Sequence, residues 1–455
     1  MANPARSLTL MIACLIMTTA LSGCSILLDK LTEVKETDPQ QASQAFVGAL
    51  KNITPEKDTY FKTMTDIYIT VTVLDQSNNP LPDALVTITD KEAYNITFIK
   101  DVTDENGAVS GFVTIRSGYP AIAIKAQSVD GLAALQDIVV SENTSTYNIQ
   151  LKVSPVINSS AFRPLVEYPD SDNDGVPNAW DEYPFDPSRS FLQTTIYPHI
   201  ISFEDLYPSS GDRDTNDLAA YIDINTKTAK KGYLKSISGT VKLKARGAKE
   251  TYLSDFGIRF LLNNNIANAG NAASLGSARI EEYTSRNVLI RTQSVTIMNN
   301  SDLILPLFSN TGNKFGTDHG LINTFMNKPF NPGGQVLFSV TFEDPMNLKT
   351  SLYEMYDPYL KITNFQGTIY DIHRPFFNPL PNSADPTTGQ ASKFIDDNNF
   401  PFCVMIPMST WFWPLETVDI SLSYPDIFNW VNSNFKNSQQ WYTDPDINLV
   451  YTKSQ

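Results

Sequence analysis

The sequence is short of the residues on which most enzyme signatures depend. Its 455 residues include only three histidines and three cysteines, and charged side chains make up 18% of the chain. His199, His319 and His373 lie far apart and form no H-x-x-x-H or H-E-x-x-H motif, so we expect no zinc centre. The chain also lacks G-x-S-x-G, P-loop and G-x-G-x-x-G motifs, which removes the common signatures of serine hydrolases and nucleotide-binding enzymes.

Positive charge is scarcer than negative charge. Lys and Arg number 34 against 49 Asp and Glu, which gives a formal net charge of −15. Binding to nucleic acid needs clustered cationic side chains, so we expect no nucleic-acid partner. The acidity is compatible with cation binding. A hydrophobic fraction of 42% is ample for packed cores, and the length suits two or three domains.

The hydrophobic run near the N-terminus is too short to span a bilayer. It covers the 14 residues from Leu8 to Leu21 after Arg6, whereas a membrane span needs about 20. It ends in Leu21-Ser22-Gly23-Cys24, which resembles the lipobox of bacterial lipoproteins. The resemblance implies a signal peptide at residues 1–23, acylation of Cys24 and a membrane partner through that lipid anchor. Ser25 in place of aspartate implies the cell outer membrane. The alternative is an ordinary signal peptide with a chance cysteine.

The remaining cysteine belongs to a hydrophobic strand pattern. Once Cys14 leaves with the signal and Cys24 carries lipid, only Cys403 remains, so no disulfide is expected within the chain. The surrounding F-C-V-M-I predicts a buried strand, and we expect a packed thiol rather than a nucleophile.

Residues 24–153 divide into a polar segment and a β-rich module. Residues 24–62 are interpreted as a lipidated tether of coil, with room for a short helix at Ala42–Leu50. In residues 63–153 apolar side chains alternate, as at Ile67 and Ile69, and Asn106-Gly107 favours a type I′ hairpin. This pattern predicts a small β-sandwich. The stretches V-L-D-Q-S-N-N-P-L-P-D and T-D-E-N-G resemble immunoglobulin-like modules of bacterial surface proteins and the carboxypeptidase regulatory-like family, which implies a spacer more often than a ligand binder.

Residues 154–190 form a linker that contains calcium-loop spacing. The expected ligands, at positions 1, 3, 5, 7, 9 and 12 of the loop, are Asp170, Asp172, Asp174, the backbone carbonyl of Val176, Asn178 and Asp181. Gly175 allows the sharp bend. The nearby prolines exclude the flanking helices of an EF-hand, and the loop resembles a single thrombospondin type-3 repeat. The alternative is a solvated acidic turn in which the side chains cap backbone amides.

A second acidic run follows shortly downstream. Its candidate Ca²⁺ ligands are Glu204, Asp205, Asp212, Asp214, Asn216 and Asp217. Hard oxygen ligands at this density suit Ca²⁺ better than zinc or copper. Two other interpretations are open. The carboxylates can cap backbone amides in a turn, or a carboxylate pair drawn from Glu204, Asp205, Asp212 and Asp214 can hydrolyse a glycosidic bond.

The same run carries a family resemblance. The segment F-E-D-L-Y-P-S-S-G-D-R-D-T-N-D-L resembles the signature of the LruC domain family of bacterial surface lipoproteins. Supporting motifs are D-E-Y-P-F-D-P-S-R-S-F, I-Y-D-I-H-R-P, F-P-F-C-V-M-I-P, W-P-L-E and S-Y-P-D-I-F-N-W. Arg213 and Thr215 depart from the pattern, in which aromatic residues are commoner. The resemblance implies an exported outer-membrane lipoprotein and supplies no enzymatic activity.

Residues 191–455 read as a larger β-domain, so the predicted fold class is all-β: a small sandwich, a calcium-loop linker and a larger sandwich or jelly-roll-like domain. Trp411, Trp413, Trp430 and Trp441 are expected in the core, with stacking on sugars as the alternative. We predict a lipid-anchored cell-envelope protein with Ca²⁺-stabilised β-domains that binds an unidentified surface, matrix or host ligand or serves in architecture. The alternative function is hydrolysis of an envelope polysaccharide.

Overall fold

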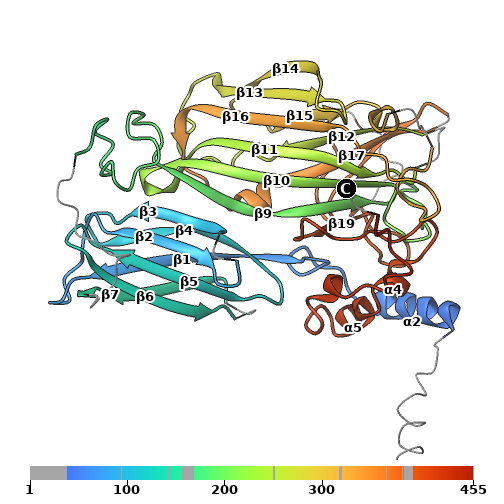
Figure 1. Cartoon of the computed structure of the whole chain (residues 1–455), viewed down its shortest axis with the longest axis horizontal. Helices are drawn as coiled ribbons and strands as arrows, with labels where there is room; N and C mark the ends of the chain where they lie inside the picture. The colour runs from blue at the N-terminus through green and yellow to red at the C-terminus, as the bar shows by residue number, and fades with distance from the viewer. Residues whose placement is uncertain are drawn as a thin grey trace, which may run out of the picture. The chain divides into compact units, whose positions relative to one another are not determined.

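Figure 1 shows the computed structural model of the chain, which describes residues 38–453 except 94, 142–143, 156–168, 249–251, 317–319, 365, 382 and 384–392. The predicted signal peptide, Cys24, the first part of the predicted tether and His319 lie outside the described residues. The chain divides into two compact units, Met1–Ala45 and Phe46–Gln455. Within the described ranges, no helix has the length and apolar character needed to cross a bilayer.

The first β-module is a sandwich of two sheets. One sheet has the order β4-β1-β7 and the other β3-β2-β5-β6-β8. Ile67, Ile69, Val71 and Val73 all point into one core, which confirms the predicted alternation. The strands are β1 (Met64–Leu74), β2 (Leu85–Asp90), β3 (Thr97–Val102), β4 (Ala108–Arg116), β5 (Ala121–Gln127), β6 (Leu132–Val139), β7 (Thr146–Lys152) and β8 (Ser154–Pro155).

The predicted hairpin at Asn106-Gly107 is wrong. A tight turn does form there, and the Gly107 amide donates to the Asp104 carbonyl at 2.9 Å. Only Gly107 has a positive φ, of 69°, whereas a type I′ turn needs one at Asn106 as well. The strands on either side, β3 and β4, then separate and pair with β2 and β1 in different sheets. The turn therefore connects the two layers.

The second β-module pairs a large antiparallel sheet with a smaller one. The large sheet has seven strands in the order β14-β13-β16-β11-β10-β9-β19, and the other has four in the order β15-β12-β17-β18 (Figure 1). Strands of the large sheet are β9 (Phe191–Phe203), β10 (Leu218–Ala229), β11 (Tyr233–Ala245), β13 (Ser274–Tyr283), β14 (Leu289–Met298), β16 (Gln335–Met346) and β19 (Cys403–Ile406). The small sheet contains β12 (Leu253–Phe260), β15 (Leu303–Phe308), β17 (Tyr356–Thr363) and β18 (Ile369–Ile372).

Alternating side chains from both sheets fill one core. Ile222 and Val241 of the large sheet belong to the same buried cluster as Ile258 and Leu360 of the small one. Helical elements are few and short: α2 (Pro39–Lys51), η1 (Lys230–Gly232), η2 (Thr311–Lys314), α3 (Leu352–Met355), α4 (Ile420–Ser423), α5 (Asp426–Asn432) and η3 (Trp441–Thr443). The fold is all-β, as predicted.

The short helix for which Ala42–Leu50 left room is confirmed by α2, but the prediction that residues 46–62 belong to a solvated tether is wrong. The aromatic rings of Tyr60 and Phe61 are buried against Phe435 and Trp430, with ring centroids of Phe61 and Trp430 5.2 Å apart. We call residues 400–453 the closing block, because they form the last described part of the chain. Residues 46–62 pack on this block as part of the core. Burying their large apolar side chains is more favourable than leaving them exposed to water in a coil.

Cys403 and His373 are both buried in the second β-module. Cys403 on β19 is buried, as expected, and burial raises the pKa of its thiol, which keeps it unreactive. His373 follows β18, and two carboxylates lie beside its ring. Its Nδ1 lies 2.8 Å from Asp357 Oδ2, and its Nε2 lies 3.2 Å from Asp371 Oδ2. Trp411, Trp413, Trp430 and Trp441 are all buried, as predicted, in the cluster of the closing block.

Candidate cation sites

The linker loop, residues 170–181, is held against the β-modules by two apolar side chains. Val176 and Trp180 are buried in a small cluster with Val102 of β3 and Phe191 of β9. The chain bends sharply at Asn173 and Gly175, whose φ angles are 61° and 88°. Asparagine and glycine tolerate this left-handed conformation better than other residues, so the sequence favours the bend locally.

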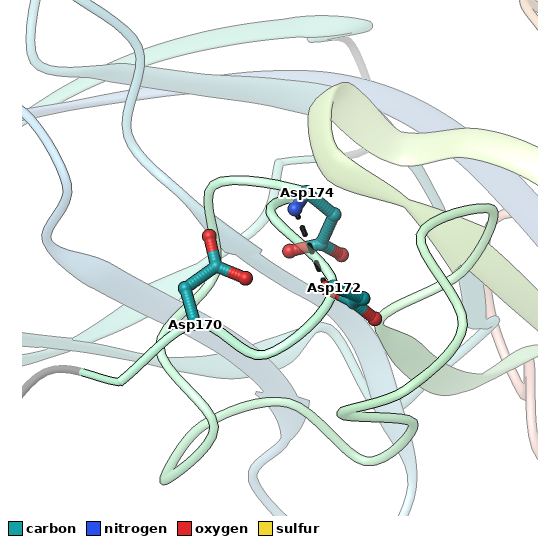
Figure 2. A group of neighbouring side chains, drawn as sticks. All are labelled: Asp170, Asp172 and Asp174. Atoms are coloured by element: carbon teal, nitrogen blue, oxygen red, sulfur yellow. Dashed lines mark hydrogen bonds between the residues drawn. The ribbon is translucent and has the colours of Figure 1, made fainter.

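The bend turns three carboxylates of the linker loop toward one another. Figure 2 shows Asp170, Asp172 and Asp174 around the same turn, and one oxygen from each lies within 4.8 Å of the others. Ca²⁺ binds oxygens at about 2.3–2.6 Å, so two ligands on opposite sides of the ion are about 5 Å apart. The spacing of these three carboxylates therefore fits a calcium ion.

Backbone amides donate hydrogen bonds to some of the same carboxylates. The amides of Asn173 and Gly175 donate to Asp170 at 2.8 and 2.9 Å, and the Val176 amide donates to Asp174 at 2.8 Å. Each carboxylate oxygen has two lone pairs, so such bonds orient the ligands without consuming them. The predicted Asx-type turn and the predicted ion site thus share one geometry.

Two oxygens of the loop are buried without a hydrogen-bond donor. They are Oδ2 of Asp172 and Oδ2 of Asp181. Burial, followed by repulsion from Asp174, Asp172 and Asp170, raises the pKa of Asp181 to about 6. Burial and Asp174 also raise the pKa of Asp172. A divalent cation would relieve both the desolvation and the repulsion.

The side chain of Asn178 forms hydrogen bonds within the loop. Its Oδ1 accepts from the Ser171 amide at 2.9 Å, and its Nδ2 donates to Ser171 Oγ at 2.8 Å. It closes the loop across its base. The structure therefore brings together the carboxylates predicted at positions 1, 3 and 5, and places Asp181 within electrostatic reach of them.

The second acidic run is the connection between β9 and β10. Phe203 at the end of β9 is the register partner of Leu218 at the start of β10, so the residues between them must double back at the sheet edge. This folding brings Glu204 close to Asp212 and Asp214. We call these three residues the buried acidic cluster; one oxygen from each lies within 4.8 Å of the others.

Two of the three carboxylates in the cluster are almost completely buried. Glu204 and Asp214 are each 2% exposed, whereas Asp212 is exposed. Glu204 accepts from the Thr215 amide at 2.8 Å through Oε1, but its Oε2 has no hydrogen-bond partner. A Cβ on Gly211 would lie 2.3 Å from that oxygen, so any larger residue there would have to displace the Glu204 carboxylate. An unsatisfied buried carboxylate oxygen is costly, which points to a missing positive partner.

The electrostatics of the cluster agree with its geometry. Burial, followed by repulsion from Asp214 and Asp212, raises the pKa of Glu204 well above its usual range. Burial, followed by repulsion from Asp212, raises the pKa of Asp214 to about 8. Like charges in a dry setting cannot all ionise unless a cation joins them.

The other residues predicted in this run hold the turn. The Asp205 amide donates to Asp217 Oδ2 at 2.7 Å, and the Asn216 side chain donates to the Pro414 carbonyl at 3.1 Å. Burial and the neighbouring Asp205 raise the pKa of Asp217 well above its usual range. The predicted capping of backbone amides thus applies to Asp217 and also to Glu204 and Asp214. The structure also places Glu204, Asp212 and Asp214 around a common point.

Glu416 also lies beside this cluster and was missed by sequence reasoning. The neighbouring Thr417 amide donates to Asp214 Oδ2 at 2.7 Å, and Glu416 Oε2 is buried without a hydrogen-bond partner. Burial, with repulsion from Asp212, raises the pKa of Glu416. Its motif W-P-L-E contributed only to the family resemblance, because no local spacing connects residue 416 with residue 214.

A cavity of about 390 Å³ lies elsewhere, between the sandwich and the large sheet. Aromatic, hydroxyl, amide and carboxyl groups line it, among them Tyr68, Phe112, Asp101, Thr195, Thr226 and Asn347. Neither Glu204 nor Asp214 lines this cavity.

Taken together, these features define an all-β protein with two packed β-modules and two acidic clusters. Residues 232–442 match a family described as a domain of unknown function, DUF4842. Among curated proteins, none is significantly similar to this chain.

The fold is similar to that of a candidate lipoprotein from Bacteroides ovatus. The TM-score is 0.50 at 14% identity, and the match covers 81% of this chain and 99% of that one. Chlorocatechol 1,2-dioxygenase from Pseudomonas putida matches 34% of this chain and 99% of its own, at 12% identity and a TM-score of 0.17. BcpA, the major pilin subunit of Bacillus cereus, matches 68% of this chain and 67% of its own, at 9% identity and a TM-score of 0.15. The last two scores are too low to support any conclusion.

Proposed function

We propose that the chain is a lipid-anchored protein of the bacterial cell envelope, located at the outer membrane, that serves in surface architecture and is stabilised by Ca²⁺. The lipobox-like Leu21-Ser22-Gly23-Cys24 and the LruC-like motifs support export and anchoring. The candidate lipoprotein from Bacteroides ovatus, which shares the fold, is consistent with this class. In this proposal the first sandwich is an immunoglobulin-like spacer.

The membrane anchor is testable by changing one residue. In the expressing bacterium, wild-type protein should incorporate labelled palmitate and fractionate with the outer membrane. Cys24→Ser should lose both the label and the membrane association, because one thiol carries the attachment. Cys403→Ser is the matched control and should retain both. Equal labelling of the two variants would reject the anchor.

The calcium role depends chiefly on one observation. Oδ2 of Asp172 and Oδ2 of Asp181 are buried without a donor beside three converging carboxylates. A bound Ca²⁺ would satisfy these oxygens and tie the linker loop to itself. Extracellular calcium modules bind at roughly 10⁻⁴–10⁻³ M, and at ten times Kd the gain is about 1.4 kcal/mol. An ion bound this way acts as a structural brace.

Calorimetric titration with calcium and thermal melting in calcium or chelator test the brace. Asp172→Asn should remove one bound ion and reduce the calcium-dependent rise in Tm. Asp75→Asn is the matched control, because Asp75 also caps two amides, those of Ser77 and Asn79, each at 2.8 Å, but lies in an exposed turn. If both variants behave alike, the linker loop is a solvated acidic turn.

The hydrolase alternative has less support. A glycosidase needs its two carboxyl groups beside a bound sugar, one as an acid and one as a base or nucleophile. Glu204 and Asp214 are each 2% exposed, so a sugar ring cannot reach them.

Surface binding is a second candidate function, favoured by the cavity next to the sandwich. The rings of Tyr68 and Phe112 lie 5.0 Å apart, and the hydroxyls of Thr195 and Thr226 are 2.6 Å apart. Aromatic faces beside hydroxyl, amide and carboxyl groups suit a saccharide that carries no negative charge. Titration with maltohexaose, cellohexaose and mannohexaose should show binding of at least one, lost in Tyr68→Ala and kept in Tyr147→Ala. The absence of binding to all three would reject saccharide binding.

A further inference from the structure

The closing block runs along the acidic connection between β9 and β10. The Asn216 side chain donates to the Pro414 carbonyl at 3.1 Å, and the Ile420 amide donates to the Arg213 carbonyl at 2.9 Å. Between these contacts the Thr417 amide donates to Asp214 Oδ2 at 2.7 Å. Residues 414–420 therefore cover the buried acidic cluster.

Glu416 stands in the middle of this cover. Its backbone amide donates to the Thr324 carbonyl at 3.0 Å, which fixes the chain, while its side-chain Oε2 is buried without a partner. Glu204 Oε2 has the same status and belongs to a residue that is 2% exposed. Glu204 and Glu416, from distant parts of the sequence, thus both lie close enough to the Asp214 carboxylate to repel it.

The cation nearest in sequence is directed elsewhere. Arg213 lies between Asp212 and Asp214, yet its guanidinium donates to Asp419 Oδ2 at 2.6 Å. No ion pair with Glu204, Asp214 or Glu416 is found within the described ranges. Lys328 attracts the Glu416 carboxylate without forming an ion pair with it, so most of the negative charge is left for a ligand to balance.

Another buried glutamate, Glu282, has its negative charge neutralised by ion pairs. Glu282 is also 2% exposed, but it forms ion pairs with Arg291 at 2.9 Å and Lys314 at 2.6 Å. Burying a carboxylate without such partners costs several kcal/mol. Glu204 and Glu282 are equally buried, and only Glu282 has positive side chains beside it.

We propose that Glu416 completes a buried divalent-cation site with Glu204, Asp212 and Asp214, and that the ion fastens the closing block to the β9–β10 connection. All four side chains offer hard oxygen ligands, which favours Ca²⁺ over zinc or copper. This inference shares with the proposed function only the identity of the ion, because none of its ligands lies in the linker loop.

The test uses the full soluble mature chain, with calorimetric titration of calcium and hydrogen exchange in calcium or chelator. The wild type should bind two ions, and calcium should slow amide exchange in residues 411–424. Glu416→Gln should weaken one site at least about tenfold and abolish that slowing. Glu354→Gln is the matched control: a half-buried glutamate, paired with Lys62 at 2.8 Å, that lies outside the cluster.

The experiment tests the two calcium sites independently. Asp172→Asn should remove the linker ion and leave the protection of residues 411–424 intact. If Glu416→Gln does not fold, Glu204→Gln replaces it, with the same expected loss. Two unchanged sites in the variant, or calcium protection of the closing block equal to that of the wild type, would overturn the proposal even if the linker loop binds its ion.

Discussion

The linker loop and the buried acidic cluster use one backbone pattern in two different environments. In both, acidic residues alternate with residues of positive φ: Asn173 and Gly175 in the linker loop, Arg213 and Thr215 in the cluster. In both, three carboxylates converge within 4.8 Å. The three converging carboxylates of the linker loop, Asp170, Asp172 and Asp174, are half-buried, whereas Glu204 and Asp214 are each only 2% exposed. The alternation brings the ligands together, and burial decides how costly an unoccupied site is.

The cost of leaving each site without an ion differs because the dielectric around the carboxylates differs. Two like charges about 4 Å apart repel by about 1 kcal/mol in water and by about 4 kcal/mol at an effective dielectric of about 20. Water around the linker loop therefore substitutes in part for an ion, whereas at the cluster water reaches Asp212 but hardly reaches Glu204 and Asp214. The three predictions below separate the two sites, beginning with the largest expected effect.

Without calcium, we expect the protein to lose stability as pH rises from about 4 to about 8. The folded-state pKa values of Asp181 and Asp214 are raised to about 6 and about 8, so stability is present while these groups are protonated and is lost as they ionise. Calcium should remove most of this loss, because the ion stabilises the ionised carboxylates.

Melting curves in chelator and in calcium at pH 5 and pH 8 measure this effect. A residual pH dependence should persist in calcium, since burial also raises the pKa of Asp66 to about 6 and of Asp101 to about 7, outside the acidic loops. Identical curves in chelator and calcium at pH 8 would contradict the prediction for both sites at once.

Asp214→Asn should stabilise the protein in chelator and destabilise it in calcium. In chelator at pH 8 the variant should be more stable than wild type, by an amount on the order of a few kcal/mol, because each pKa unit corresponds to about 1.4 kcal/mol. In saturating calcium it should be less stable, since a ligand is lost. Urea unfolding under both conditions gives the two free energies. Glu282→Gln should destabilise in both, because its partners are side chains.

The smallest effects concern two glycines. Gly211→Ala would place a Cβ 2.3 Å from Glu204 Oε2, so it should disrupt the cluster and weaken its calcium binding. Gly175→Ala meets only the end of Lys230 at 3.2 Å but has a φ of 88°, which costs about 1 kcal/mol for an L-residue. Calcium titration should therefore show the larger loss for Gly211→Ala. Equal losses would mean that the two loops are supported alike.

The linker loop was the easier feature to predict from sequence. Its ligands lie within twelve positions of one another, so spacing alone states which oxygens converge. Glu204 and Asp214 were predicted for the same reason, since both belong to one connection. Glu416 could not be, because its place beside Asp214 depends on how the closing block packs, and a single sequence does not record that.

The fold shows the same limit. The alternation of Ile67 and Ile69 is a local property, and their shared face was predicted. The partners of β3 and β4 are set by distant strands, so the Asn106-Gly107 turn was misread as a hairpin. Residues 24–62 were interpreted as a polar tether, yet Phe46, Tyr60 and Phe61 pack against aromatic residues far along the chain. Local polarity therefore predicted a coil where long-range packing makes a core.

The packing of residues 46–62 against the closing block has a mechanical consequence. A pull that arrives along the polypeptide from its N-terminal side reaches the aromatic contact of Phe61 with Trp430 before it reaches β1. The load therefore passes first into the C-terminal end of the fold and bypasses the sandwich. Under tension, the contact between Phe61 and Trp430 is expected to break first.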